Sequence, residues 1–159
     1  MQSDSNPTEA MMKAITAGDA VLAAPVHVAD VMTKAPMSML PHQSFAEVVA
    51  MMANRSFHHM LVVDEDERLH GVISDRDVLR ALSRTPDWSK KSVAEIMSPD
   101  AVTTTPESAI STALSLMLEK RINCLPVIGP DGRVAGILTS TDLLKAYEKL
   151  QAKIEQRAL

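Results

Sequence analysis

The sequence predicts a mixed α/β (α+β) fold, made of two β-α-β-β-α units packed about a pseudo-twofold axis, with an extra N-terminal helix. The main observation is an ungapped internal repeat, because residues 65 positions apart agree in identity or character over most of the chain. Identical pairs include Val28 and Val93, Pro41 and Pro106, Gly71 and Gly136, and Asp77 and Asp142. A period this long, present twice, indicates a tandem rather than a solenoid. Units of this size bury little surface alone, which favours packing the two together.

Apolar runs that alternate with polar turns predict the elements of each copy. In the first copy, Ser44 is expected to cap a helix, because Glu47 stands at the capping-box spacing and apolar residues follow at helical spacing. Its strands are expected over residues 37–40, 60–63 and 69–73, and its second helix over 75–84. The second copy repeats this order, with strands over 101–104, 124–128 and 134–138, an apolar helical stripe from Ile110 to Met117, and a last helix from Ser140.

This pattern divides the chain into five parts. They are a leader over 1–25 with a helix expected over 8–23, unit 1 over 26–84, a linker over 85–91, unit 2 over 92–147, and a helical extension over 148–159. The extension continues an apolar line formed by Leu143, Tyr147, Leu150 and Ile154. That line is expected to contact either another subunit, which we favour, or the leader helix.

Composition excludes several classes of protein. The net charge is −4 and no block of like charge is long, which argues against nucleic acid as the main partner. The single cysteine, Cys124, rules out an internal disulfide framework and suits a reducing compartment. No apolar stretch is long enough to span a membrane, and the N-terminus does not resemble a signal peptide. We therefore expect a cytoplasmic protein.

The junction between strand and helix near the end of each copy carries the chemistry. Thr139 and Asp142 in the second copy, and Ser74 and Asp77 in the first, place a hydroxyl and a carboxylate three residues apart. This spacing is typical of a capping box, which only starts a helix. The same geometry offers amide groups to a phosphate and a carboxylate to ribose hydroxyls. The two interpretations are compatible, and spacing alone leaves both open.

The paired histidines and the acidic run do not indicate a metal site, and no motif indicates catalysis. His58 and His59 are adjacent, and neighbouring strand residues point to opposite faces, so no metal site is expected there. The acidic run over 64–67 departs from the pattern of a calcium-binding loop. No phosphate-binding loop, hydrolase or metalloprotease motif occurs, and no nucleophile–base pair is visible. The sequence therefore predicts that the chain is not an enzyme.

Several motifs that occur twice in the same order carry a family resemblance. Each copy has an apolar segment ending in Met, a Pro before a helix, and the pattern Gly-x-x-Ser/Thr-x-x-Asp, and the second copy adds Leu125-Pro126-Val127. Over about Val26 to Tyr147 the chain resembles a tandem pair of CBS domains. The resemblance implies a regulatory module that binds an adenosine-containing ligand such as AMP, ADP, ATP or S-adenosylmethionine. It also implies a homodimer that acts on a separate, unidentified partner protein.

The resemblance also assigns roles to residues. Ribose binding falls to Asp142, Thr139, Asp77 and Ser74, and phosphate binding to Ser140, Thr141, Arg76 and Asp75. The adenine pockets are expected from Val102, Thr103, Ile122 and Leu125 for the second copy, and from Met37, Ser38, Phe57 and Met60 for the first. The charge of Asp75 suits a phosphate poorly, so the second copy is expected to be the better nucleotide site. The alternative to ligand binding is a scaffold in which both motifs only cap helices.

Overall fold

The structure is a computed structural model, and it describes residues 25–157. The helix predicted over 8–23 lies outside this range. Unit 1 contains η2 (Val28–Asp30), β1 (Ser38–Met39), α2 (Phe45–Asn54), β2 (His59–Val63), β3 (Leu69–Ser74) and α3 (Asp75–Arg84). After η3 (Trp88–Lys90), unit 2 contains α4 (Val93–Ile96), α5 (Ile110–Lys120), β4 (Cys124–Ile128), β5 (Val134–Thr139) and α6 (Ser140–Arg157).

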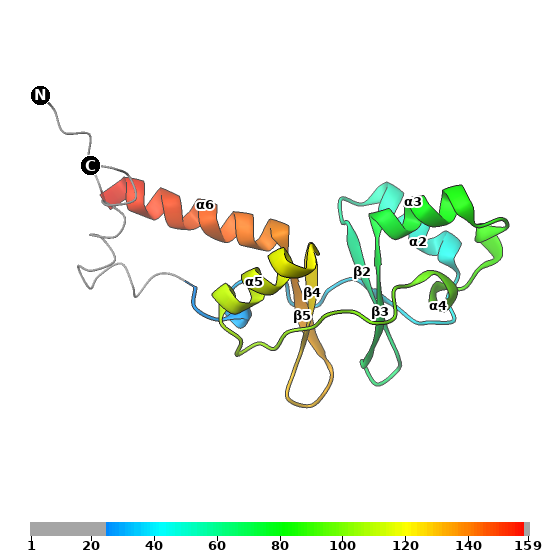
Figure 1. The fold of residues 1–159 in the computed structure, drawn as a ribbon, viewed down its shortest axis with the longest axis horizontal. Helices are drawn as coiled ribbons and strands as arrows, with labels where there is room; N and C mark the ends of the chain where they lie inside the picture. The colour runs from blue at the N-terminus through cyan, green and yellow to red at the C-terminus, as the bar shows by residue number, and fades with distance from the viewer. Residues whose placement is uncertain (1–24, 158–159) are drawn as a thin grey trace, which may run out of the picture.

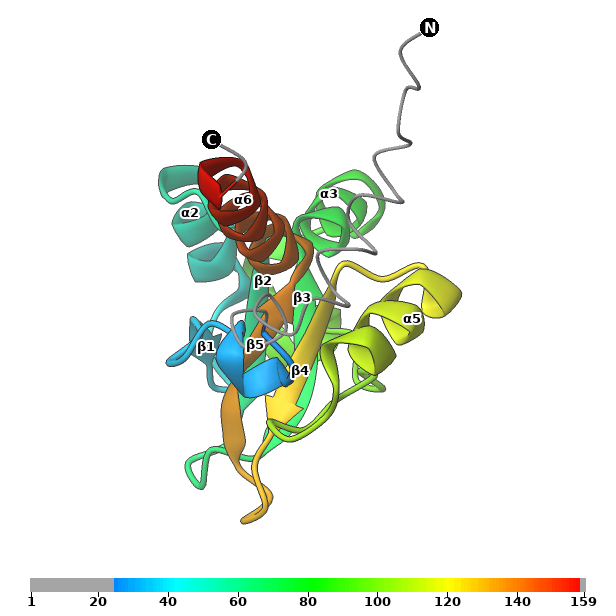
Figure 2. The ribbon, with the colours of Figure 1, turned by 90° about the vertical axis from the view of Figure 1, so that its left-hand side faces the viewer.

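The two units stand side by side with their hairpins in the middle and their helices outside (Figures 1 and 2). In unit 1, β2 pairs parallel with β1 and antiparallel with β3. In unit 2, β4 pairs antiparallel with β5, and both hairpins carry a register shift at the equivalent position. The inner faces meet through a third cluster of buried residues, made of Leu61, Val63, Val72 and Ile137. The predicted fold class is confirmed.

The strand predicted over 101–104 is wrong, because the chain there makes only one parallel bridge, between Thr104 and Val127. In unit 1 the amide of Leu61 donates a hydrogen bond to the carbonyl of Met37 over 3.0 Å, which helps to hold β1. The residue equivalent to Leu61 in unit 2 is Pro126. Proline has no N–H group, so this ladder bond cannot form in unit 2 and only the isolated bridge remains.

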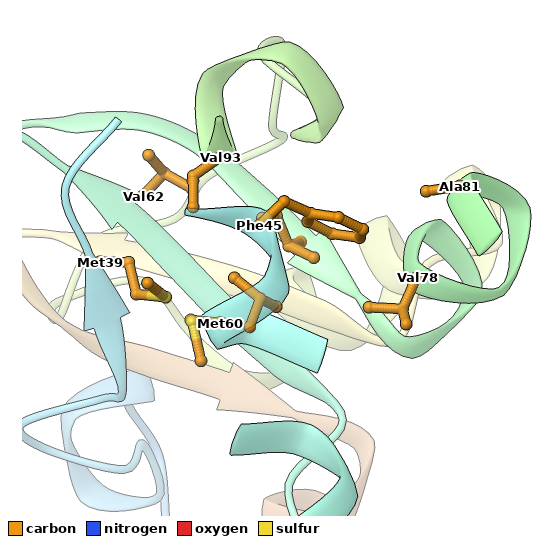
Figure 3. Packing of buried hydrophobic residues seen from close by; sticks show 9 residues of the cluster. Met39, Phe45, Met60, Val62, Val78, Ala81 and Val93 are labelled. Carbon is orange, nitrogen blue, oxygen red and sulfur yellow. The ribbon is translucent and has the colours of Figure 1, made fainter. Parts of the chain in front are cut away.

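The short segment that begins each unit packs against the other unit. Val28 is fully buried beside Leu125 and Leu138 in the core of unit 2. Val93 is fully buried beside Phe45 and Met60 in the core of unit 1, as Figure 3 shows. This reciprocal packing is what a pseudo-twofold axis produces, and each core is completed by residues from the other half of the chain.

Two glycines allow these leading segments to approach the hairpins. A Cβ atom on Gly71 would lie 2.6 Å from the carbonyl oxygen of Ser98, and one on Gly136 would lie 2.6 Å from that of Thr33. Thr33 and Ile137 exchange two backbone hydrogen bonds of 2.9 and 3.0 Å, and so do Ser98 and Val72. The leading segment of each unit therefore runs directly over the last strand of the other unit, just before the Ser/Thr-x-x-Asp motif.

Candidate ligand-binding site

A cleft of about 850 Å³ lies between the two units and is bordered by the starts of both α3 and α6. Both Ser/Thr-x-x-Asp motifs line this one cleft. Its charged lining consists of four carboxylates, two permanent cations and two histidines, which are Asp75, Asp77, Asp100, Asp142, Arg76, Lys145, His58 and His59. The internal repeat thus yields two related half-sites that face a shared space.

The Asp142 half-site is built on a capping box at the start of α6. Asp142 Oδ2 accepts hydrogen bonds from the amide and the hydroxyl of Thr139, over 2.8 and 2.9 Å. Asp142 Oδ1 accepts a 2.8 Å hydrogen bond from the hydroxyl of Thr33, which belongs to the leading segment of unit 1. One carboxylate oxygen therefore holds the helix start, and the other is oriented by a hydroxyl of the opposite unit.

The Asp77 half-site repeats this geometry at the start of α3. Asp77 Oδ2 accepts hydrogen bonds from the amide and the hydroxyl of Ser74, over 2.9 and 2.8 Å, and its side chain is only 12% exposed. Asp77 Oδ1 accepts a longer hydrogen bond of 3.4 Å from the guanidinium group of Arg80. Ser98, the equivalent of Thr33, lines the cleft from the leading segment of unit 2. Both carboxylates are thus fixed in position before any ligand binds.

The two half-sites differ at the first residue of each helix. In unit 1, Asp75 Oδ2 lies 3.2 Å from His58 Nδ1. The equivalent pair in unit 2 is Ser140 and Asn123, where the Ser140 hydroxyl donates to the Asn123 carbonyl over 3.3 Å. An acid and an imidazole at one helix start therefore correspond to a hydroxyl and an amide at the other.

The cleft brings together most of the residues that the resemblance assigned. Twelve line it: Asp142, Thr139, Asp77, Ser74, Ser140, Thr141, Arg76, Asp75, Val102, Ile122, Met37 and Phe57. Met60 and Leu125 instead lie fully buried within the two cores, while Ser38 and Thr103 are exposed and stand apart from the lining. Their role in an adenine pocket stays a prediction, and the structure offers no cleft surface at these four positions.

Sequence reasoning missed four lining residues that bear on the chemistry, and one of them is the carboxylate of Asp100. Thr33 contacts Asp142 although the two are 109 residues apart, so no local pattern could indicate it. Lys145 and Asn123 also line the cleft, from one turn into α6 and from the approach to β4. The repeat could have indicated these two positions, because Lys145 and Asn123 are the equivalents of Arg80 and His58 in unit 1.

Burial changes the titration of two groups in the cleft. Burial is the largest cause that lowers the pKa of His59, and the Asp75 carboxylate opposes the shift. Burial also raises the pKa of the Cys124 thiol to about 11, and the Asp77 carboxylate adds to the effect. The described residues hold no group of three or more His, Cys, Asp or Glu side chains that could bind a metal ion.

The raised pKa predicts that the Cys124 thiol reacts slowly with alkylating reagents. Because the thiolate is the reactive form, we expect iodoacetamide at pH 8 to alkylate Cys124 at least about tenfold more slowly in the folded protein than in urea. Mass spectrometry of timed samples measures both rates. The alkylation rate of a small thiol, measured in urea and in buffer, corrects for the effect of urea on the reaction itself. Equal rates in the folded and unfolded protein would contradict the prediction.

The fold and the cleft define a tandem α/β module with two related ligand half-sites. The sequence model of the CBS domain matches residues 28–84 and 93–149. The chain therefore belongs to the CBS domain family, which confirms the resemblance.

Comparisons with known proteins extend this assignment. The chain is 29% identical over 128 residues to an inosine-5′-monophosphate dehydrogenase of Methanocaldococcus jannaschii, covering 80% of this chain but 25% of that enzyme. It thus spans about a quarter of the length of this curated relative. The structure resembles the CBS domain pair of protein MJ0100 in complex with 5′-methylthioadenosine and S-adenosyl-L-methionine, with a TM-score of 0.70, 27% identity, and coverage of 79% and 98% of the two chains. It also resembles CBSX2 in complex with AMP, with a TM-score of 0.70, 26% identity, and coverage of 80% and 99%.

Within residues 25–157, no helix combines the length and the apolar character that a bilayer crossing requires.

Proposed function

We propose that this chain is a non-catalytic regulatory module that binds an adenosine-containing ligand in the cleft between its two CBS units. The observation that carries this proposal is the pair of pre-positioned carboxylates, Asp142 and Asp77, each held by its own capping box on the wall of one shared cleft. A carboxylate fixed in this way accepts hydrogen bonds from the two hydroxyls of a ribose without further ordering. Related CBS pairs that bind 5′-methylthioadenosine, S-adenosylmethionine or AMP support the class of ligand.

Binding would regulate a partner protein in the cytoplasm through a shift between two arrangements of the units. A ligand held by Asp142 would lie beside the hydrogen bond from Thr33, which joins the motif of unit 2 to the leading segment of unit 1. A ligand shifts such an equilibrium only by its difference in affinity for the two arrangements. No cofactor is needed for this role.

Isothermal titration calorimetry with AMP, ADP, ATP and S-adenosylmethionine tests the proposal. We expect at least one of them to bind with a measurable heat and to raise the thermal midpoint in proportion to its affinity. The alternative is a ligand-free scaffold. The observation in its support is that both carboxylates already cap helices, a role that needs no ligand. No heat and no thermal shift with any of the four would leave the scaffold as the better account.

The proposed homodimer rests on an apolar surface that repeats in both units. Leu79 and Leu82 on α3 are 67% and 40% exposed, and their equivalents on α6, Leu144 and Tyr147, are 68% and 55% exposed. Exposed apolar groups that recur under a pseudo-twofold axis suit a second copy, because an isologous interface pairs the same patch from both subunits. The second copy is therefore the occupant we propose.

Charged residues in this surface are expected to abolish the dimer. The double variant Leu79→Glu/Leu144→Glu should halve the mass measured by light scattering at tens of micromolar protein, because it places unpaired charges in an apolar interface. Leu118→Glu is the matched control, since Leu118 is 71% exposed on α5, outside the patch. Loss of the dimer in the control alone, or no change in the double variant, would place the interface elsewhere.

A further inference from the structure

The starts of α3 and α6 differ in charge, although the repeat makes them equivalent. Asp75 and Asp77 both lie in the first turn of α3, whereas Asp142 is the only acid in the first turn of α6. The N-terminus of a helix carries a partial positive charge that attracts anions. In α3 the side chain of Asp75 already places an anion at the N-terminus of the helix. In α6 the equivalent residue is Ser140, whose neutral hydroxyl leaves that N-terminus available to an anionic ligand.

The surroundings of the two helix starts strengthen this difference. Asp75 is 59% exposed and lines the cleft, with its Oδ2 atom 3.2 Å from His58 Nδ1. On the α6 side, Lys145 adds a cation to the lining, next to the neutral groups of Ser140, Thr141 and Asn123. On the α3 side, Arg76 is the cation that lines the cleft beside Asp75 and Asp77, while Arg80, which contacts Asp77 over 3.4 Å, stands outside the lining.

We propose that the two half-sites select adenosine ligands by the charge of the 5′ group. The Asp142 half-site takes a 5′-phosphate, and the Asp77 half-site takes a 5′ group that is neutral or cationic, such as a thioether or a sulfonium. This inference rests on the proposed function, and it deepens that function by giving each half-site its own class of ligand. The module would then report on two metabolite pools at once, because each half-site contributes to the same cleft.

The arrangement of hydrogen bonds gives the physical reason for selection. In both helices the amide of the first residue is already bonded to a carbonyl, that of His58 or of Asn123, over 3.0 Å. The amide of the third residue is bonded to the hydroxyl of Ser74 or Thr139. Backbone donors are thus equally used in the two half-sites, and the side chain at the first helical position decides the local charge. A carboxylate there repels a phosphate and attracts a sulfonium.

Three probes that share adenosine but differ in charge test the inference in the full chain. They are AMP, which is anionic, 5′-methylthioadenosine, which is neutral, and S-adenosylmethionine, which carries a cationic sulfonium. In the unmodified protein, S-adenosylmethionine is expected to bind after saturation with AMP, with less than about a threefold loss of affinity, because the two occupy different half-sites. Loss of S-adenosylmethionine binding in the presence of saturating AMP would overturn the inference.

The repeat supplies matched variants that exchange the deciding residues. Ser140→Asp is expected to weaken AMP binding by about tenfold or more while 5′-methylthioadenosine changes by less than about threefold. Asp75→Ser should add a second equivalent of bound AMP. Asp66→Ser is the control, since it removes an exposed acid in the hairpin turn at the far end of β2.

The possible failures are distinguishable. If none of the three probes binds the unmodified protein, and ADP and ATP do not bind either, the proposed function is wrong and the inference falls with it. If only ADP or ATP binds, the proposed function stands and the selection by charge is wrong. If the three probes bind, but Ser140→Asp leaves AMP affinity unchanged or lowers all three affinities equally, only the selection by charge is wrong.

Discussion

Replacing Asp142 with alanine is expected to weaken AMP binding by about 1.5–3 kcal/mol, or roughly 10- to 150-fold. The loss is large because charge-assisted hydrogen bonds to a carboxylate are stronger than neutral ones, and because the carboxylate is held in place before the ligand arrives. Calorimetric titration of the variant and of the unmodified protein measures the difference. Asp77→Ala is the matched variant in the other half-site, and under the same titration it should change AMP affinity by less than about threefold.

A structural side effect of this substitution can be separated from the loss of a ligand contact. Asp142 also caps α6 and accepts a hydrogen bond from Thr33. Thr33→Val removes that second bond but keeps the carboxylate, so it should retain most of the affinity, and thermal unfolding of all three variants shows how much stability each one loses. If Asp142→Ala binds AMP like the unmodified protein while Asp77→Ala abolishes binding, our assignment of the phosphate half-site is falsified.

Alanine at Gly71 or at Gly136 is expected to lower the free energy of unfolding by about 1–3 kcal/mol in each case. The added Cβ would meet a backbone carbonyl oxygen at 2.6 Å, and that carbonyl cannot retreat without breaking a hydrogen bond to Val72 or to Ile137. Urea denaturation measures the change. Because the two contacts are equivalent in the repeat, the two variants should lose similar amounts of stability.

Gly129→Ala serves as the control for this prediction. A Cβ there would come closer than ordinary contact only to Asp131 Oδ1, at 3.0 Å. That side chain can rotate away at the cost of one exposed hydrogen bond from the Arg133 amide, so the expected loss is below about 1 kcal/mol. Unfolding midpoints for Gly71→Ala and Gly136→Ala that match the control would show that the leading segments can shift at little cost.

The elements that could be predicted from the sequence are those whose signals are local. The helix over 75–84 and the strand over 124–128 were found with the predicted bounds, because helical spacing and an apolar run between polar turns define them. The strand over 101–104 failed because its partner strand contains Pro126, and a missing donor is a property of the pairing rather than of the segment itself. The capping geometry of Thr139 and Asp142 was likewise visible in their spacing.

Contacts between the two halves could not be predicted in this way. Periodicity shows that Val28 and Val93 are apolar, but it does not show that each joins the core of the other unit. The same limit applies to the site, where Thr33 reaches Asp142 across 109 residues. For this reason the pocket residues were grouped by copy in the prediction, whereas Thr33 of unit 1 contacts the motif of unit 2 and Ser98 of unit 2 pairs with the strand before the motif of unit 1.

The reciprocal packing of the leading segments also says something about how such a chain can arise. In a single 65-residue repeat on its own, the leading valine would have no core of another unit to pack into. The core of that repeat would also lack the valine that the other unit supplies. Two separate copies would satisfy both by trading these segments, as partners in a swapped dimer. The present chain is equivalent to such a dimer with its two polypeptides joined between the repeats, so the exchange does not depend on concentration. Joining also allows the two copies to differ, so that Asp75 at one helix start corresponds to Ser140 at the other, which two identical polypeptides could not achieve.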